Sequence, residues 1–175
     1  MIPVVAISRC LLGEKVRYDG GDKQHGLIVN VLVPRIVVVP VCPEWEAGLG
    51  IPRRPVRLVS GPGGRIRVQT AEPPYCDWTA RMIGQCRRWV GDWGRCLDGA
   101  VLKGRSPSCG SGDVPLAEGG EDTDGLLVRA LKGEVPQMPV SNDSRLRTVD
   151  EIEAFLRAVR LYRRSRKNPV YAVGW

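Results

Sequence analysis

The sequence predicts an α/β fold: a single three-layer domain with a mostly parallel sheet, helices on both faces and a small β-hairpin. Apolar, β-branched runs are typical of strands buried on both faces, and they occur at 3–8, 36–39 and 100–102. Helical periodicity follows in two later segments, 77–93 and 148–162. We expect one domain over 1–175, with 143–175 as a C-terminal helical extension, because no repeat or long linker divides the chain.

The elements up to residue 69 follow from turn residues and apolar runs. A short helix over 26–32 leads into the second strand, whose apolar run is interrupted by Pro40. The segment 45–55 is dense in glycine and proline, which favours an irregular loop. Two runs, at 56–60 and 65–69, flank Gly61-Pro62-Gly63-Gly64 and predict a β-hairpin laid on the main sheet.

The segment 77–93 is the clearest helix in the sequence. Five apolar residues are spaced by four, four, three and four positions and therefore share one face: Trp78, Met82, Cys86, Trp89 and Trp93. We therefore interpret Cys86 as a core residue rather than a ligand. Cys76 and Cys96, which lie just before and just after this segment, are also interpreted as structural.

Three elements are expected in the last third of the chain. A helix is predicted over 125–132 and a last strand over 137–140. Thr148 and Glu151 have the spacing of a capping box, which predicts the start of the final helix. The basic run 163–167 ends that helix; such a run could touch nucleic acid but is more often a solvated helix end.

Composition limits the class of protein. No apolar run approaches the ~18 residues that a membrane span needs. The first residues enter a strand without the features of a secretory signal, so we expect a cytoplasmic protein. The six cysteines include no C-x-x-C pair and are better interpreted as thiols or metal ligands than as a disulfide framework. The net charge of +7 favours anionic partners without naming one.

Three of the cysteines follow predicted strands. Cys10, Cys42 and Cys109 come after the runs at 3–8, 36–39 and 100–102, so parallel strands would bring them to one edge of the sheet. Three thiolates can ligate zinc or three irons of a 4Fe-4S cluster. Because long stretches of chain separate the three cysteines, the fold itself would build the site, with room left at a fourth position.

Other side chains near these cysteines could supply proton chemistry. Glu44 lies two residues after Cys42, Ser106 three residues before Cys109, and Ser108 could hydrogen-bond the sulfurs of a cluster. Competing motifs are weaker. His25 is the only histidine, which leaves a Ser-His-Asp triad or a Cys-His dyad unsupported. The sequence contains neither a G-x-x-x-x-G-K-[ST] loop nor a G-x-G-x-x-G motif after a strand.

Four motifs together resemble the thiouracil desulfidase family. They are S-R-C-L-L-G at 8–13, R-Y-D-G-G at 17–21, V-C-P-E at 41–44 and K-G-R-S-P-S-C-G at 103–110. The resemblance runs from the N-terminus to about Val140. It implies removal of sulfur from a thiolated pyrimidine such as 2-thiouracil, giving uracil and sulfide on a 4Fe-4S cluster with three cysteine ligands and one open iron. It further implies that Cys10, Cys42 and Cys109 are the cluster ligands, Glu44 the acid/base residue and Ser106 the assisting hydroxyl.

The chain departs from this family's pattern in three places. Arg9 stands where a small residue is usual, Gly104 stands where an acidic one is common, and the tail after Asn142 has no counterpart. An arginine beside Cys10 could narrow or recharge the pocket. Two alternatives remain open: a non-catalytic three-cysteine protein that binds zinc or an iron–sulfur cluster, and desulfidation of thiolated tRNA, which the basic surface would bring to the same site.

Overall fold

The fold is built on a four-stranded parallel sheet. The computed structural model describes residues 2–166. The sheet has the order β2-β1-β5-β6 and every neighbouring pair is parallel. Its strands are β1 (Val4–Ser8), β2 (Val37–Val41), β5 (Gly99–Leu102) and β6 (Val140–Asn142). Side chains alternate between two buried clusters, so Val5 and Ile7 face one layer while Ala6 faces the other.

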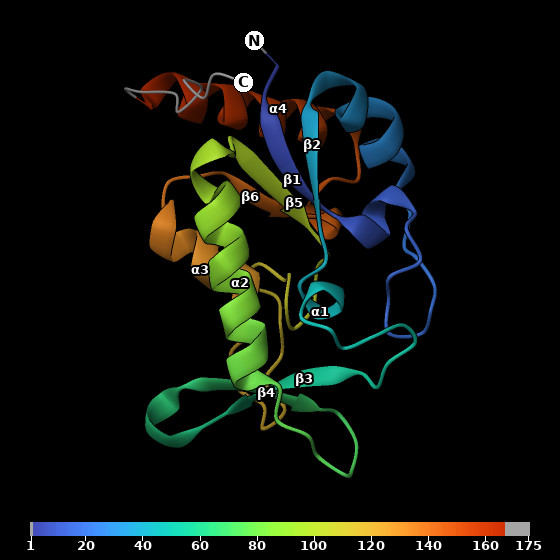
Figure 1. The fold of residues 1–175 in the computed structure, drawn as a ribbon. Helices are drawn as coiled ribbons and strands as arrows, with labels where there is room; N and C mark the ends of the chain where they lie inside the picture. The colour runs from blue at the N-terminus through green and yellow to red at the C-terminus, as the bar shows by residue number, and fades with distance from the viewer. Residues whose placement is uncertain (1, 167–175) are drawn as a thin grey trace.

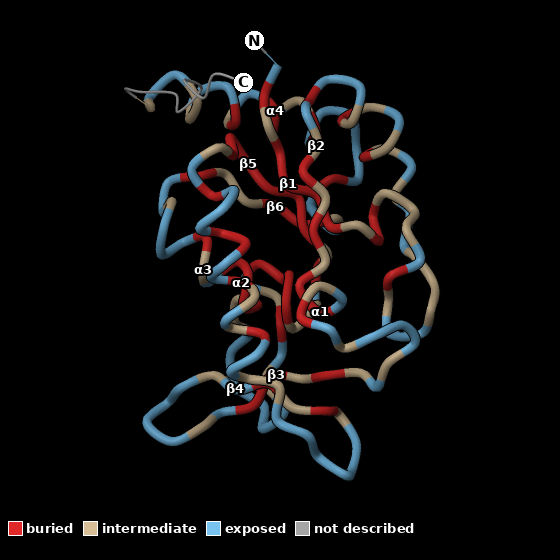
Figure 2. Tube along the Cα trace, in the orientation of Figure 1, coloured by how far each residue is buried: buried red, intermediate tan, exposed pale blue. Residues whose placement is uncertain are grey.

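Helices cover both faces of this sheet (Figure 1). One face packs against α2 (Thr79–Trp93) and α3 (Leu126–Glu134). The opposite face packs against α4 (Val149–Ser165) and the helical turns before β2, at Ile28–Leu32 and Val33–Arg35. Figure 2 shows the sheet as the most continuously buried part of the chain. The predicted α/β class, with a mostly parallel sheet, helices and a hairpin, is confirmed.

A separate antiparallel hairpin lies beyond the carboxyl ends of the strands (Figure 1). It consists of β3 (Val56–Ser60) and β4 (Ile66–Thr70), joined by a turn at Pro62–Gly64. Leu58 forms a bridge with Leu116, which ties the hairpin to the loop after β5. The hairpin lies opposite the end of the sheet, rather than flat on it as the sequence suggested, and residues of both line one cavity.

Local sequence features explain most element boundaries. Thr148 and Glu151 form the predicted capping box at the start of α4. Pro40 lies within β2 and does not break it, because β2 is an edge strand and needs no further amide partner on its free side. The last strand begins at Val140, later than predicted, because a turn in which the Met138 amide donates to the Val135 carbonyl occupies the preceding residues.

Short helical turns complete the described chain: Arg9–Leu12 after β1, α1 (Pro43–Glu46) after β2, Gly94–Cys96 after α2 and Asp143–Arg145 after β6. Of the basic run at 163–167, Lys167 lies outside the described residues. Within residues 2–166, no helix is both long enough and apolar enough to cross a membrane.

Candidate functional site

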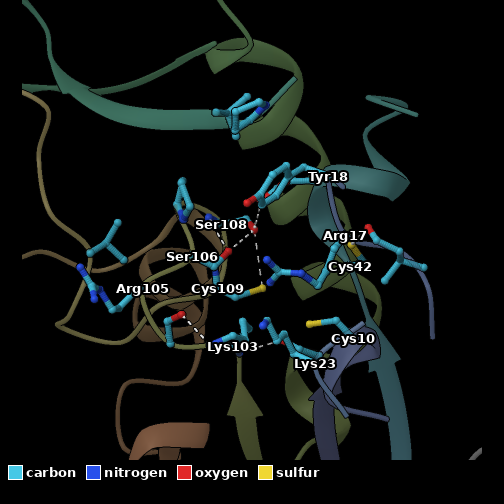
Figure 3. A pocket seen from close by; sticks show the side chains of 18 of the residues that line it. Cys10, Arg17, Tyr18, Lys23, Cys42, Lys103, Arg105, Ser106, Ser108 and Cys109 are labelled. Atoms are coloured by element: carbon cyan, nitrogen blue, oxygen red, sulfur yellow. Dashed lines mark hydrogen bonds between the residues drawn. The ribbon is translucent and has the colours of Figure 1, made fainter. Parts of the chain in front are cut away.

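Three cysteines from three strand ends line one cavity. Cys10 lies in the helical turn after β1, Cys42 directly follows β2, and Cys109 lies in the loop after β5. These strands are neighbours in the sheet, so their carboxyl ends place the three side chains around the same space of about 630 Å³ (Figure 3). The cavity lies where the chain order reverses about β1, the position at which open α/β sheets bind ligands.

The three thiols lie within electrostatic reach of one another. Burial, together with the nearby Cys42, raises the pKa of Cys10 to about 11. Burial also raises the pKa of Cys42. The pKa of Cys109 is well above its usual value, first because of burial and then because of Cys42 and Cys10. Without a metal these thiols are protonated; a bound metal would favour the thiolates, because coordination removes the proton.

The loop that carries Cys109 is fixed by backbone hydrogen bonds to the start of α3. The amides of Leu126 and Leu127 donate to the carbonyls of Pro107 and Ser108 at 3.1 and 2.8 Å. Gly125 lies directly against the loop, since a Cβ there would be 2.8 Å from the backbone nitrogen of Cys109. The free amides of a helix N-terminus thus find their partners in the cysteine loop, which sets the position of Cys109.

Ser8 adds a second tie to this loop from the end of β1. Its hydroxyl oxygen accepts the Lys103 amide at 2.9 Å, and its hydroxyl group partly offsets the rise in the pKa of the Cys109 thiol. Ser8 is buried at 2% exposure. The strand-end serine therefore links β1, β5 and one of the three cysteines.

Glu44 reaches the same cavity from α1. The turn begins at Pro43, whose missing amide hydrogen suits the first helical position, and Cys42 precedes it with extended backbone. The Glu44 side chain is nearly buried and accepts hydrogen bonds from two sides. Arg53 donates to Oε2 through Nε at 3.0 Å and Nη2 at 2.8 Å, and the Ser108 hydroxyl donates to Oε1 at 2.9 Å.

Ser106 reaches Glu44 only through Ser108. The two hydroxyl oxygens lie 3.0 Å apart, and Ser108 also lies 3.7 Å from the Cys109 sulfur (Figure 3). Because one hydroxyl has a single hydrogen, Ser108 donates either to Glu44 or to the sulfur, and in both cases Ser106 is the donor in its contact with Ser108. The structure thus brings both predicted residues to the cavity, with Ser108 as the direct partner of Glu44.

Cationic side chains form much of the remaining wall. Glu44 is the only acidic residue among the described residues that line this cavity, whereas seven basic ones do so: Arg9, Arg17, Lys23, Arg53, Arg57, Lys103 and Arg105. Apolar surface comes from Pro107 and Val114 on the loop and from Val56 and Leu58 on the hairpin. The cavity can therefore hold a flat, partly polar molecule between apolar contacts and bind anionic groups at its basic wall.

Arg9, which precedes Cys10 and departs from the usual small residue there, contacts three neighbouring side chains. Its guanidinium pairs with Glu14 at 2.9 Å and Glu46 at 3.6 Å, and lies 5.3 Å from the centroid of the Trp45 ring. These contacts connect the turn after β1 to α1. Arg9 therefore links the elements that carry Cys10 and Glu44, besides forming part of the wall.

Within the described residues, no group of three or more His, Cys, Asp or Glu side chains is arranged to hold one metal ion. A 4Fe-4S cluster differs from a single ion in what it requires, since each of its cysteine ligands binds a different iron.

Sequence reasoning missed Arg53 and the turn α1. The segment 45–55 was expected to be irregular, but its first two residues belong to the helical turn α1. A proline at position 43 followed by two acidic residues in the first turn could have indicated this turn. Nothing in the sequence distinguishes Arg53 from Arg54 beside it, because the partner of Arg53 comes from the fold.

Comparisons with known proteins give consistent results. The model of the 2-thiouracil desulfurase family matches residues 5–143. YbbK of Bacillus subtilis, an uncharacterised protein, is 29% identical over 121 residues, which cover 63% of this chain and 76% of YbbK. The solved structure of the 4Fe-4S-dependent thiouracil desulfidase TudS matches with a TM-score of 0.69 and 28% identity, covering 89% of this chain and 98% of TudS.

Proposed function

The chain belongs to the 2-thiouracil desulfurase family, and we propose that it removes sulfur from a thiolated pyrimidine such as 2-thiouracil on a 4Fe-4S cluster. The reaction exchanges one atom: the thiolated carbon loses sulfur and gains oxygen from water, so that thiouracil and water give uracil and hydrogen sulfide. The exchange needs no oxidant or reductant. It needs a group that binds the leaving sulfur and a group that moves protons.

The residues present fit a cluster with three protein ligands. Cys10, Cys42 and Cys109 line one cavity from three strand ends, and thiolates are the ligands that iron–sulfur clusters use. When bound, such a cluster has one iron without a protein ligand, which can act as a Lewis acid toward the sulfur of the substrate. The convergence of the three cysteines with Glu44 on this cavity is the observation that carries the proposal.

Glu44 and the two serines would move the protons. Glu44 Oε1 accepts the Ser108 hydroxyl, and Ser108 contacts Ser106, which also lines the cavity. A proton taken from water at Ser106 can therefore reach Glu44 Oε1 by a shift of two hydroxyl hydrogens, and return by the same path to the ring or the leaving sulfur. Arg53 keeps a positive charge beside the carboxylate throughout.

Substrate binding would use the remaining walls of the cavity. The apolar side chains of Val56, Leu58, Pro107 and Val114 can contact the faces of a pyrimidine ring. The serine hydroxyls and the basic groups can bind its ring oxygen and nitrogen atoms.

Anaerobically purified protein tests this function. We expect a brown protein with about four irons and four sulfides per chain that converts 2-thiouracil to uracil and sulfide. One zinc per chain, with no uracil formed, would instead support a non-catalytic metal protein and overturn the proposal.

Thiolated RNA is a second candidate substrate, favoured by the basic wall of the cavity. Arg17, Lys23, Arg57 and Arg105 could contact phosphates flanking a thiolated base. Incubation with thiolated tRNA, followed by nucleoside analysis, distinguishes the two: loss of the thionucleoside supports RNA, whereas conversion of the free base alone argues against it.

A further inference from the structure

Arg53 is a buried cation whose place in the reaction the family resemblance does not define. Its side chain is 5% exposed and lines the same cavity as the three cysteines. Burying a guanidinium is unfavourable unless its hydrogens find acceptors. The position of those acceptors shows what Arg53 holds in place.

The two carboxylate oxygens of Glu44 have different hydrogen-bond donors, and Arg53 contacts only one of them. Both Nε and Nη2 donate to Oε2, at 3.0 and 2.8 Å, whereas Oε1 accepts the Ser108 hydroxyl at 2.9 Å. Two donors on Oε2 leave it little capacity for a further proton. Oε1 is therefore the oxygen left to exchange protons with its surroundings.

Arg53 also fixes the loop that follows Cys10. Its Nη1 donates to the carbonyl of Val16 at 2.9 Å, and its backbone amide donates to the carbonyl of Tyr18 at 2.8 Å. The Cys42 thiol donates to the same Val16 carbonyl at 3.9 Å. That contact is lost when the thiol gives up its hydrogen to bind a metal, but the bond from Arg53 remains.

We propose that Arg53 is a positioning residue for desulfidation, an inference that rests on the proposed function. Arg53 holds Glu44 by Oε2, so that Oε1 faces the Ser108 hydroxyl and the substrate. A planar guanidinium can donate to the carboxylate and to the Val16 carbonyl at once, in fixed directions. A lysine ammonium keeps the charge but loses this geometry.

Steady-state kinetics of the cluster-loaded enzyme test this role. For Arg53→Lys we expect kcat to fall roughly 10–100-fold, as for other residues that orient an active group, while KM stays within about threefold. Iron content and the visible spectrum should equal those of the wild type. In Arg53→Ala, added methylguanidinium should restore part of kcat, which a purely structural defect would not allow.

Arg54→Lys is the matched control. Arg54 is the exposed neighbour, and its guanidinium donates to backbone carbonyls of 72–74 instead of Glu44. It should retain wild-type kcat. A wild-type kcat in Arg53→Lys, or a loss of activity that only follows a loss of iron or of folded protein, would overturn the positioning role.

A second measurement separates this inference from the proposed function. If the wild type converts no thiolated base, the proposed function fails, and the Arg53–Glu44 linkage is measured in cluster-free protein. The free energies of unfolding of the wild type, Arg53→Lys, Glu44→Gln and the double variant form a double-mutant cycle. A coupling of roughly tenfold or more in the unfolding equilibrium supports the positioning of Glu44 by Arg53, and additive effects overturn it.

Discussion

The Ser108 hydroxyl donates a hydrogen bond to Oε1 of Glu44 at 2.9 Å. This bond joins the loop after β5 to the helical turn after β2, across the cavity that the three cysteines share. Ser108 also stands beside Ser106 and Cys109. It is thus the point at which the candidate proton path meets a candidate ligand.

Ser108→Ala should lower kcat roughly 10–100-fold without loss of iron. The change removes the donor to Glu44 and interrupts the path to Ser106, and general acid–base steps contribute 10²–10⁴-fold in enzymes. Ser111→Ala is the control, since Ser111 is buried on the same loop but does not line the cavity. Steady-state kinetics and iron analysis check the result; equal kcat in both variants would remove Ser108 from the mechanism.

Glu44→Gln should retain the cluster and lower kcat by about 10²–10⁴-fold, because an amide cannot take up a proton at Oε1. Arg53 would then lack its buried counter-charge, so the free energy of unfolding should fall by about 1–3 kcal/mol in urea titrations. Glu46→Gln on the same turn keeps an acceptor for the Cys42 amide and should retain activity. A near-normal rate in Glu44→Gln would refute its role.

Cys109→Ala and Cys86→Ala should have opposite effects. Cys109 lines the cavity, so its removal should abolish colour and turnover together. Cys86 is buried at 1% exposure in the core face of α2. Cys86→Ala should therefore lower the free energy of unfolding by about 1 kcal/mol and leave colour and turnover unchanged. Visible absorption and thermal unfolding measure the two effects, and full colour in Cys109→Ala would show that Cys109 is not a ligand.

The sheet and the meeting of the cysteines were predictable because they depend on local patterns. Buried parallel strands have continuous apolar sequences, and whatever follows them must gather at one edge, as Cys10, Cys42 and Cys109 do. The capping box at Thr148 is likewise complete within four residues. Such features require no knowledge of how distant loops fold.

The polar contacts of the site were not predictable in this way. Glu44 meets Ser108 across 64 positions of sequence, and Arg53 meets Glu44 from a loop without periodicity. Sequence reasoning paired Ser106 with Glu44, whereas Ser108 lies between them. A displacement of one residue in either loop would change these partners, so their identity depends on the assembled fold.

Asp77 should make stability depend on pH. Asp77 accepts hydrogen bonds from Thr79 at the start of α2 and from Arg67 on the hairpin, and so connects the two elements. These hydrogen bonds lower the pKa of Asp77 to about 2. A lowered pKa stabilises the fold above the unfolded-state value of about 3.9 and loses this effect as pH falls toward 2. Asp77→Asn should therefore be less stable than the wild type at pH 6, and the difference should shrink between pH 4 and 2 in urea titrations. A difference in stability between the two proteins that stays constant from pH 6 to pH 2 would contradict this role of Asp77.

Gly125→Ala should disrupt the cysteine loop through steric contact alone. The backbone of Gly125, with φ −68 and ψ 165, suits any residue, so strain in its own conformation is not the cause. An added Cβ would lie 2.8 Å from the Cys109 nitrogen and 2.8 Å from the Ser108 carbonyl carbon, which are backbone atoms that cannot rotate away. We expect a loss of about 1–3 kcal/mol of stability and poor retention of iron.

Gly133→Ala, within α3, is the matched control for Gly125→Ala at the N-cap of that helix. A Cβ at Gly133 meets nothing within 4 Å, and alanine is the better helix former, so this variant should be about 0.5–1 kcal/mol more stable than the wild type. Both variants add the same methyl group, one within α3 and the other at its N-cap, and only the methyl group at Gly125 points at the loop that carries Cys109. If Gly125→Ala held iron as firmly as Gly133→Ala in a chelator challenge, close packing of α3 against the loop would not be what positions Cys109.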